Sequence, residues 1–151
     1  MQDAVQKDRK NNVTFEKVFD LKLFKEIAAD SGNKTLADET DYLRTAKFYG
    51  KKKLVSEIIN GGAGFYAGII AKKHFRLIEI AVRESEQGKG YGKEMMWRII
   101  RQCRKRGIEK ITLRTNRVQS AAGFNKRFGG VITGVNGEDY EMEIRICFTS
   151  S

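Results

Sequence analysis

The sequence predicts a mixed α/β domain whose central sheet is largely antiparallel and is flanked by helices. Short apolar runs separated by glycine-rich or polar turns indicate strands over residues 54–59, 65–71 and 77–82. Apolar residues at helical spacing then indicate a long helix over residues 91–106, ended by Gly107. Because more strands are predicted after this helix, sheet and helices belong to one α/β fold.

A single domain over residues 13–148 is expected, preceded by a flexible segment over residues 1–12 that lacks hydrophobic periodicity. With 151 residues, the chain is long enough for one sizeable core. No apolar run approaches the roughly 18 residues of a membrane span, and the polar amino terminus differs from a signal peptide. We therefore expect a cytoplasmic protein without a membrane partner.

The amino-terminal third is expected to hold two helices. Apolar residues mark one face of the first helix, which ends near Gly32: Phe19, Leu23 and Ile27. A pair that resembles a capping box, Thr35 with Asp38, would open the second helix, which ends near Gly50. The first two strands are joined by a glycine-rich turn over residues 60–64.

The remaining elements complete the sheet. A turn over residues 72–74 leads into the strand 77–82, and we expect His74 in this turn to be solvated. Beyond the long helix we expect, in order, a strand over 110–115, a helix around 119–128, and a hairpin of strands 131–134 and 140–147 turned at Asn136-Gly137.

A glycine-rich segment lies between the strand 77–82 and the long helix. Gly88, Gly90 and Gly92 recur at every second position, so the backbone can turn tightly and present bare N–H groups. The helix start directs its unpaired N–H groups and its positive dipole end to the same place. This arrangement is typical of a phosphate-binding loop. Its spacing matches neither a Walker A loop nor a dinucleotide fingerprint.

The segment Gln87-Gly88-Lys89-Gly90-Tyr91-Gly92 resembles the pattern Q/R-x-x-G-x-G/A, which is the acyl-CoA pyrophosphate loop of the GNAT superfamily of N-acetyltransferases. Residues 121–130 resemble a second block of that family, in which a helix ends at a glycine. The resemblance covers roughly residues 50–146. It implies a GNAT-like acyl-CoA-binding fold, acetyl-CoA as the cofactor, and acetyl transfer to a primary amine of a small molecule or a protein.

The resemblance also implies which residues hold the cofactor. Backbone groups of Ile80, Ala81 and Val82 would pair with the pantetheine arm and polarise the thioester carbonyl. The cofactor-binding loop would comprise Gln87, Gly88, Lys89, Gly90, Tyr91, Gly92 and Lys93, and the N–H groups of residues 88–93 would hold the pyrophosphate.

Glu79 is the candidate general base, because it is a carboxylate in an otherwise apolar strand, where burial would raise its pKa. A structural ion pair is the alternative role. The family usually has a proton-donating tyrosine for the departing thiolate where this chain has Asn125. An asparagine amide offers only a hydrogen bond. Either the thiolate leaves by a weaker hydrogen-bonded or water-mediated route, or another group such as Tyr140 is the acid. Val118 also replaces an asparagine that often contacts the cofactor in the family.

The net charge of +10 and the pI near 9.7 admit a nucleic-acid binder. Because the cations are spread over several elements, nucleic acid is not expected as a partner, and the basic residues of the long helix are read as a solvated face. Cys103 and Cys147 are expected to be buried thiols, and one histidine cannot complete a metal cluster.

Two further functional classes stay open: a non-catalytic or slow acyl-CoA-binding module, which Asn125 and Val118 favour, and a basic nucleic-acid-associated protein. A homodimer is compatible with the sequence.

Overall fold

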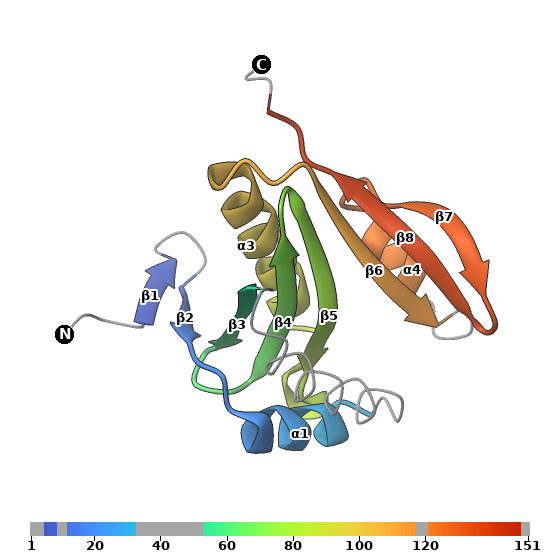
Figure 1. The fold of residues 1–151 in the computed structure, drawn as a ribbon. Helices are drawn as coiled ribbons and strands as arrows, with labels where there is room; N and C mark the ends of the chain where they lie inside the picture. The colour runs from blue at the N-terminus through green and yellow to red at the C-terminus, as the bar shows by residue number, and fades with distance from the viewer. Residues whose placement is uncertain (1–4, 9–11, 33–52, 117–120, 149–151) are drawn as a thin grey trace. The chain divides into compact units, whose positions relative to one another are not determined.

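A computed structural model describes residues 5–8, 12–32, 53–116 and 121–148 (Figure 1). The second predicted helix, with Thr35 and Asp38, lies outside these residues, and so does Val118. The chain forms two compact units. The first comprises residues 1–69 and 78–95, and the second comprises residues 70–77 and 96–151.

The strands are hydrogen-bonded in the order β1-β2-β3-β4-β5-β6-β8-β7. In the first unit, β1 (Val5–Asp8) pairs antiparallel with β2 (Val13–Lys17), which pairs antiparallel with β3 (Lys53–Ile59). β4 (Gly64–Ala71) follows the predicted glycine-rich turn. The sequence did not reveal β1 and β2, because both are short and β1 carries no apolar alternation.

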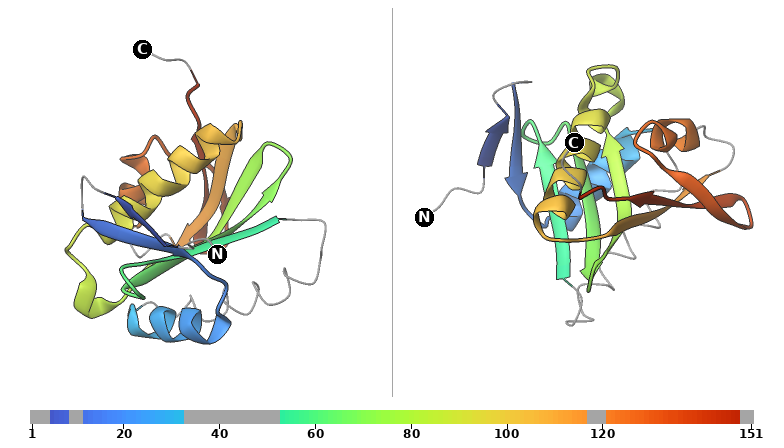
Figure 2. Two further views of the ribbon diagram at one scale, coloured as in Figure 1. Left: turned by 90° about the vertical axis from the view of Figure 1, so that its left-hand side faces the viewer. Right: turned by 90° about the horizontal axis from the view of Figure 1, so that it is seen from above.

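Helix α1 (Leu21–Asp30) covers one face of the first unit's strands, as the left view of Figure 2 shows. The Asp20 side chain caps its first turn by accepting a hydrogen bond from the Leu23 N–H, and Gly32 follows its end with φ +82°. The Phe24 ring stacks on Phe65 of β4, with centroids 4.3 Å apart. The core on this face also contains Ile27, Ala28, Ile58, Ala67 and Ala81.

β5 (His74–Val82) leads through a short 3-10 turn, η1 (Glu84–Glu86), and the glycine segment into α3 (Tyr91–Lys105). α3 has the predicted boundaries within one residue and buries the expected side chains Met96, Ile99, Ile100 and Cys103, together with Met95. Gly107 ends it with φ +73°, a backbone conformation that favours glycine.

The second unit contains the start of β5, then β6 (Lys110–Asn116), α4 (Ala121–Lys126), β7 (Val131–Asn136) and β8 (Asp139–Arg145). β5 runs parallel to β6, whereas β6–β8 and β8–β7 are antiparallel. The predicted mixed, largely antiparallel sheet with flanking helices is therefore confirmed. The hairpin turns at residues 137–138, and a register shift interrupts β7 between Ile132 and Gly134.

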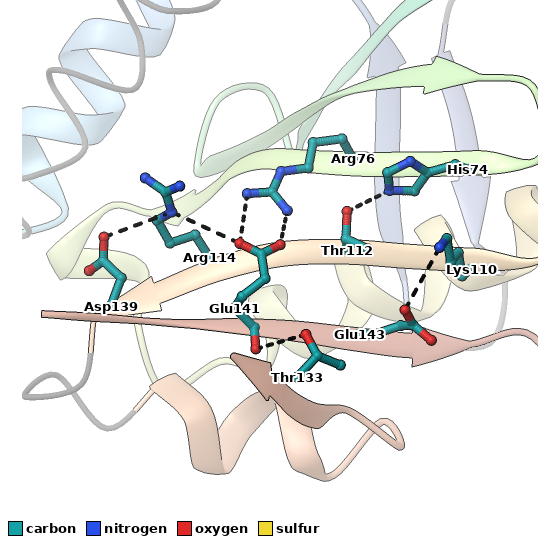
Figure 3. Close-up of polar contacts among 9 residues, drawn as sticks. All are labelled: His74, Arg76, Lys110, Thr112, Arg114, Thr133, Asp139, Glu141 and Glu143. Atoms are coloured by element: carbon teal, nitrogen blue, oxygen red, sulfur yellow. Dashed lines mark hydrogen bonds and ion pairs between the residues drawn. The ribbon is translucent and has the colours of Figure 1, made fainter. Parts of the chain in front are cut away.

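A lattice of charged side chains covers one face of β5, β6 and β8 (Figure 3). The Arg76 guanidinium donates two hydrogen bonds to the Glu141 carboxylate, and Lys110 lies 3.9 Å from Glu143. His74 belongs to this lattice, with Nε2 2.5 Å from Thr112 Oγ1. The prediction of a solvated turn histidine was wrong, because β5 begins three residues earlier than its apolar run.

The two cysteines differ from each other. Cys103 is buried on α3, and desolvation raises the pKa of its thiol to about 11. Cys147 is exposed, because β8 ends at Arg145. The prediction of a buried thiol was therefore right for Cys103 and wrong for Cys147. No helix in the part of the chain that the structure describes is long and apolar enough to cross a membrane.

Candidate functional site

The glycine segment of the first unit forms a turn that only glycines adopt readily. Gly88 has φ +85° and Gly90 has φ +84°, both in the left-handed region. Apart from its chain neighbours, no atom of the described residues lies within 4 Å of a Cβ atom built on either residue. The positive φ values, rather than crowding by these residues, therefore favour glycine, and the described residues leave space for a ligand beside the loop.

The loop delivers backbone donors to this open space. The Glu94 N–H bonds to the Gly90 carbonyl at 3.0 Å and begins the hydrogen-bond ladder of α3. The N–H groups of residues 91–93 come before this bond, so the helix supplies no acceptor for them. The side chain of Lys89 is exposed and lies 3.2 Å from Glu86. Backbone N–H groups, a helix dipole and a nearby lysine together favour an anion.

The turn between β3 and β4 holds the start of the glycine segment. The Arg83 N–H donates to the Ala63 carbonyl at 2.9 Å, and Arg83 Nε donates to the Gly62 carbonyl at 2.8 Å. The same guanidinium lies 3.0 Å from Asp30 at the end of α1. Arg83 therefore fixes the point at which the chain leaves β5.

Asn60 of the same turn holds the other end of the segment. Its Nδ2 donates to the Tyr91 hydroxyl at 2.9 Å, and its Oδ1 accepts the Thr14 N–H at 2.8 Å. Asn60 has φ +47°, a conformation that asparagine tolerates better than most residues. The sequence predicted the turn but neither of these partners, because turn residues say nothing about which distant segment they contact.

Gln87 makes contacts within the protein that the loop motif did not indicate. Its side-chain amide donates to the Val82 carbonyl at 3.0 Å and to the Ser31 carbonyl at 3.1 Å. These bonds tie the glycine segment to the end of β5 and to the end of α1. In this structure Gln87 thus supports the loop, whereas the resemblance implies that it holds the cofactor.

The end of β5 approaches β4 closely. A Cβ atom on Gly64 would lie 2.6 Å from the Ala81 carbonyl oxygen, so only glycine fits there. Ala81 is buried at 4% exposure, whereas Ile80 and Val82 on either side of it are half-buried. The three residues expected to contact the pantetheine arm therefore lie on a strand end held by Gly64, Arg83 and Gln87.

Glu79 lies two residues before Ala81 and is only 2% exposed. It belongs to the buried set of β5, whose residues alternate with half-buried ones. A second carboxylate of this unit, Glu57 of β3, is 1% exposed and accepts a hydrogen bond from the Tyr66 hydroxyl. Glu57 is not recognisable as a site residue from the sequence, because no motif includes it.

The two candidate acids belong to the second unit. Asn125 of α4 is 3% exposed, and its Nδ2 lies 3.8 Å from Met142 Sδ of β8. The Asn125 carbonyl accepts the N–H groups of Phe128 and Gly130, both at 3.1 Å. Tyr140 is half-buried and lies in the β-ladder opposite Thr115 and Val135. No described group of three or more His, Cys, Asp or Glu side chains is arranged to hold a metal ion.

Comparison with solved structures shows the same fold in several acetyltransferases. The ribosomal-protein-S18-alanine N-acetyltransferase from Escherichia coli is 19% identical, with a TM-score of 0.70, 91% of this chain covered and 96% of that chain. A putative acetyltransferase of the GNAT family from Desulfovibrio desulfuricans is 17% identical, with a TM-score of 0.73 and coverage of 89% and 99%.

The PaiA N-acetyltransferase from Thermoplasma acidophilum, solved in complex with coenzyme A, is 16% identical, with a TM-score of 0.68 and coverage of 88% of this chain and 98% of that chain. No curated protein sequence matches the chain. The sequence model of the Acetyltransferase (GNAT) family matches residues 21–129. This range includes the whole glycine segment and nearly all of residues 121–130, which contain α4. The chain therefore belongs to the GNAT acetyltransferase family.

Proposed function

We propose that the protein is an acetyl-CoA-dependent N-acetyltransferase that moves an acetyl group to a primary amine of a small molecule or a protein. The observation that supports this most is the loop conformation at Gly88 and Gly90, whose positive φ values shape the turn that precedes the α3 N-terminus. The chain's membership of the GNAT family gives this loop its functional meaning. The coenzyme A complex of the Thermoplasma protein, which shares the fold, supports the same cofactor class.

The loop and the end of β5 would share the work of holding acetyl-CoA. The pyrophosphate would accept hydrogen bonds from N–H groups of residues 88–93, with Lys89 and Lys93 adding positive charge. Backbone groups of Ile80, Ala81 and Val82 would align the pantetheine arm and polarise the thioester carbonyl. The contacts of Arg83 and Gln87 would keep this strand end in place.

Acetyl transfer requires a neutral amine, because only its lone pair can attack the thioester carbon. The new C–N bond forms, the C–S bond breaks, and the amine loses a proton while the coenzyme A thiolate gains one. Glu79 is our proposed proton acceptor, since a buried carboxylate is suited to take a proton near neutral pH.

Proton donation to the thiolate is assigned to Tyr140 rather than Asn125. The Asn125 amide has no acidic proton to give, and its Nδ2 is already directed at Met142 Sδ. A tyrosine hydroxyl can protonate a thiolate. The presence of Asn125 at the usual tyrosine position also favours a second candidate function. If no other group replaces that tyrosine, the protein would be a slow or non-catalytic acyl-CoA-binding module.

A coenzyme A release assay across a panel of small amines and amino-terminal peptides tests the proposal, alongside calorimetric titration of acetyl-CoA. Turnover with at least one amine is expected. Glu79→Gln should lower kcat about 10²- to 10⁴-fold and remove the acidic limb of the pH profile. Glu57→Gln is the matched control, because it changes another buried carboxylate of the same unit and should leave kcat unchanged.

Binding of acetyl-CoA without release on any amine would favour the non-catalytic module. An unchanged kcat in Glu79→Gln would remove Glu79 as the base, and a loss in Tyr140→Phe but not in Asn125→Ala would support the assigned acid.

A further inference from the structure

Basic residues that are far apart in the sequence converge at one end of the second unit. The basic cluster, as we call it, combines the β4–β5 turn, the end of α3, and the facing ends of β6 and β8. Its members are Lys72, Lys73, Arg104, Lys105, Arg106, Lys110 and Arg145. All belong to the same compact unit. These cations look dispersed in the sequence, because no short stretch of the chain contains them together.

Backbone contacts establish that these segments are neighbours. The Glu109 N–H donates to the Lys73 carbonyl at 2.8 Å, which joins the β4–β5 turn to the start of β6. The Glu109 carbonyl accepts the Ile146 N–H at 2.9 Å, and Arg104 Nε donates to the Cys147 carbonyl at 3.0 Å. The end of β8 is therefore linked to both β6 and α3.

The strand register adds a row across three strands. His74 of β5 lies opposite Lys110 of β6, and Lys110 lies opposite Arg145 of β8. Figure 3 shows His74 and Lys110 of this row, and Glu143, which pairs with Lys110. Desolvation and the neighbouring charges of Lys110 and Arg76 lower the pKa of His74, so the histidine does not add a further charge at neutral pH.

Only two described carboxylates pair with the cluster. Glu109 lies 3.7 Å from Lys73, and Glu143 is shared between Lys110 at 3.9 Å and Arg145 at 2.6 Å. The side chains of Lys73 and Arg145 remain 71% and 70% exposed, so these pairs are weak and leave the cations accessible. The helix dipole accounts for cations at the end of α3, but not for Lys72, Lys73, Lys110 or Arg145.

We propose that the basic cluster is a binding surface for the sugar–phosphate backbone of nucleic acid. Seven cations against two carboxylates give a concentrated positive charge, which phosphates neutralise by releasing counterions. Arginine forks from α3 and β8 suit bidentate contact with phosphate oxygens. The centre of a protein–protein interface is depleted of charged residues, so this concentration of cations favours a polyanion as the partner.

This surface would bind without reading bases, since its contacts go to phosphates. Single-stranded RNA and DNA of one length should therefore bind alike. The proposal does not depend on acetyl transfer, so either can fail alone. It would place the enzyme on a nucleic-acid scaffold, where an amine on a bound protein would be held at high effective concentration.

Fluorescence anisotropy with a labelled 20-nucleotide RNA, over about 50 to 200 mM KCl, tests the proposal. Binding should weaken steeply with salt. Lys73→Gln with Lys105→Gln removes one cation from the turn and one from the helix, and should reduce the slope of log K against log salt by about 1.4. Lys22→Gln with Lys53→Gln, two exposed lysines of the first unit, makes the same change in net charge and should leave the slope unchanged.

Equal losses in both double variants would overturn the proposal, because net charge alone would then explain binding. Absence of RNA binding at 50 mM KCl would also overturn it, and so would displacement of RNA by saturating coenzyme A. Tighter binding of polyglutamate than of RNA would replace it with an acidic protein partner. Circular dichroism and thermal midpoints establish that each variant is folded.

Discussion

At the scale of single residues, the candidate site depends on side-chain hydrogen bonds that hold the glycine segment at both ends. Asn60 connects Thr14 of β2 to Tyr91 at the start of α3, and Arg83 connects the β3–β4 turn to the end of β5. One turn therefore fixes both ends of the glycine segment. A loop that presents bare N–H groups gains affinity when it is held in the binding conformation before the ligand arrives.

Tyr91→Phe should weaken acetyl-CoA binding about threefold to tenfold, because it removes the acceptor of the Asn60 amide at a cost typical of one hydrogen bond. KM for acetyl-CoA should rise while kcat stays constant. Hydrogen exchange of the loop amides in the free protein should become faster.

Asn60→Gly should weaken acetyl-CoA binding at least as much as Tyr91→Phe, since glycine keeps the positive φ but loses the side-chain contacts to both Tyr91 and Thr14. The double variant should be no worse than Asn60→Gly alone. Asn12→Gly is the matched control, because Asn12 also has a left-handed φ, of +57°, in another turn. An equal change in Asn12→Gly would refute the positioning role of Asn60.

At the scale of elements, the parallel pairing of β5 with β6 is short. Its register covers only His74–Arg76 opposite residues 110–112. Side chains add to it, because Arg76 reaches from β5 to Glu141 on β8, and His74 contacts Thr112 on β6. The charged lattice of Figure 3 thus reinforces the junction of β5 with β6, whereas β6 and β8 are already paired along their whole length.

The folded protein should lose stability as the pH falls below about 6.5, the ordinary pKa of histidine, in part through His74. Burial is the main cause that lowers the pKa of His74, followed by repulsion from Lys110 and Arg76. The unfolded chain therefore binds a proton first, and the contribution present above 6.5 is lost as the pH falls through the folded value.

The chain has one histidine, so its ring protons can be followed individually by NMR. The midpoint of the titration should lie below 6.5, and His74→Gln should flatten the dependence of urea unfolding on pH between 7 and 5. A midpoint above 6.5 would contradict the partly buried, cation-facing environment of this ring.

At the scale of the whole molecule, the sequence predicted the sheet from β3 onward and the boundaries of α3, because those segments have clear apolar periods. It missed β1 and β2, which are short strands, the first of them without apolar alternation, and it missed the start of β5, where His74 and Arg76 occupy a polar strand face. The loop motif could be recognised in the sequence because its glycines are required by the local backbone conformation, which has positive φ values at Gly88 and Gly90. The contacts of Asn60 and the convergence of the basic cluster were not readable, because both depend on tertiary folding.

The central claim is that the glycine segment binds the pyrophosphate of acyl-CoA. Calorimetric titration of acetyl-CoA into the Gly90→Asp variant tests this claim most directly. Gly90 has φ +84°, so a side chain there strains the turn and adds a carboxylate beside the phosphates. The wild type and Gly137→Asp, a substitution at another positive-φ glycine, should bind acetyl-CoA, whereas Gly90→Asp should show no measurable binding. An unchanged affinity of Gly90→Asp for acetyl-CoA would contradict the assignment of the glycine segment as the pyrophosphate-binding loop.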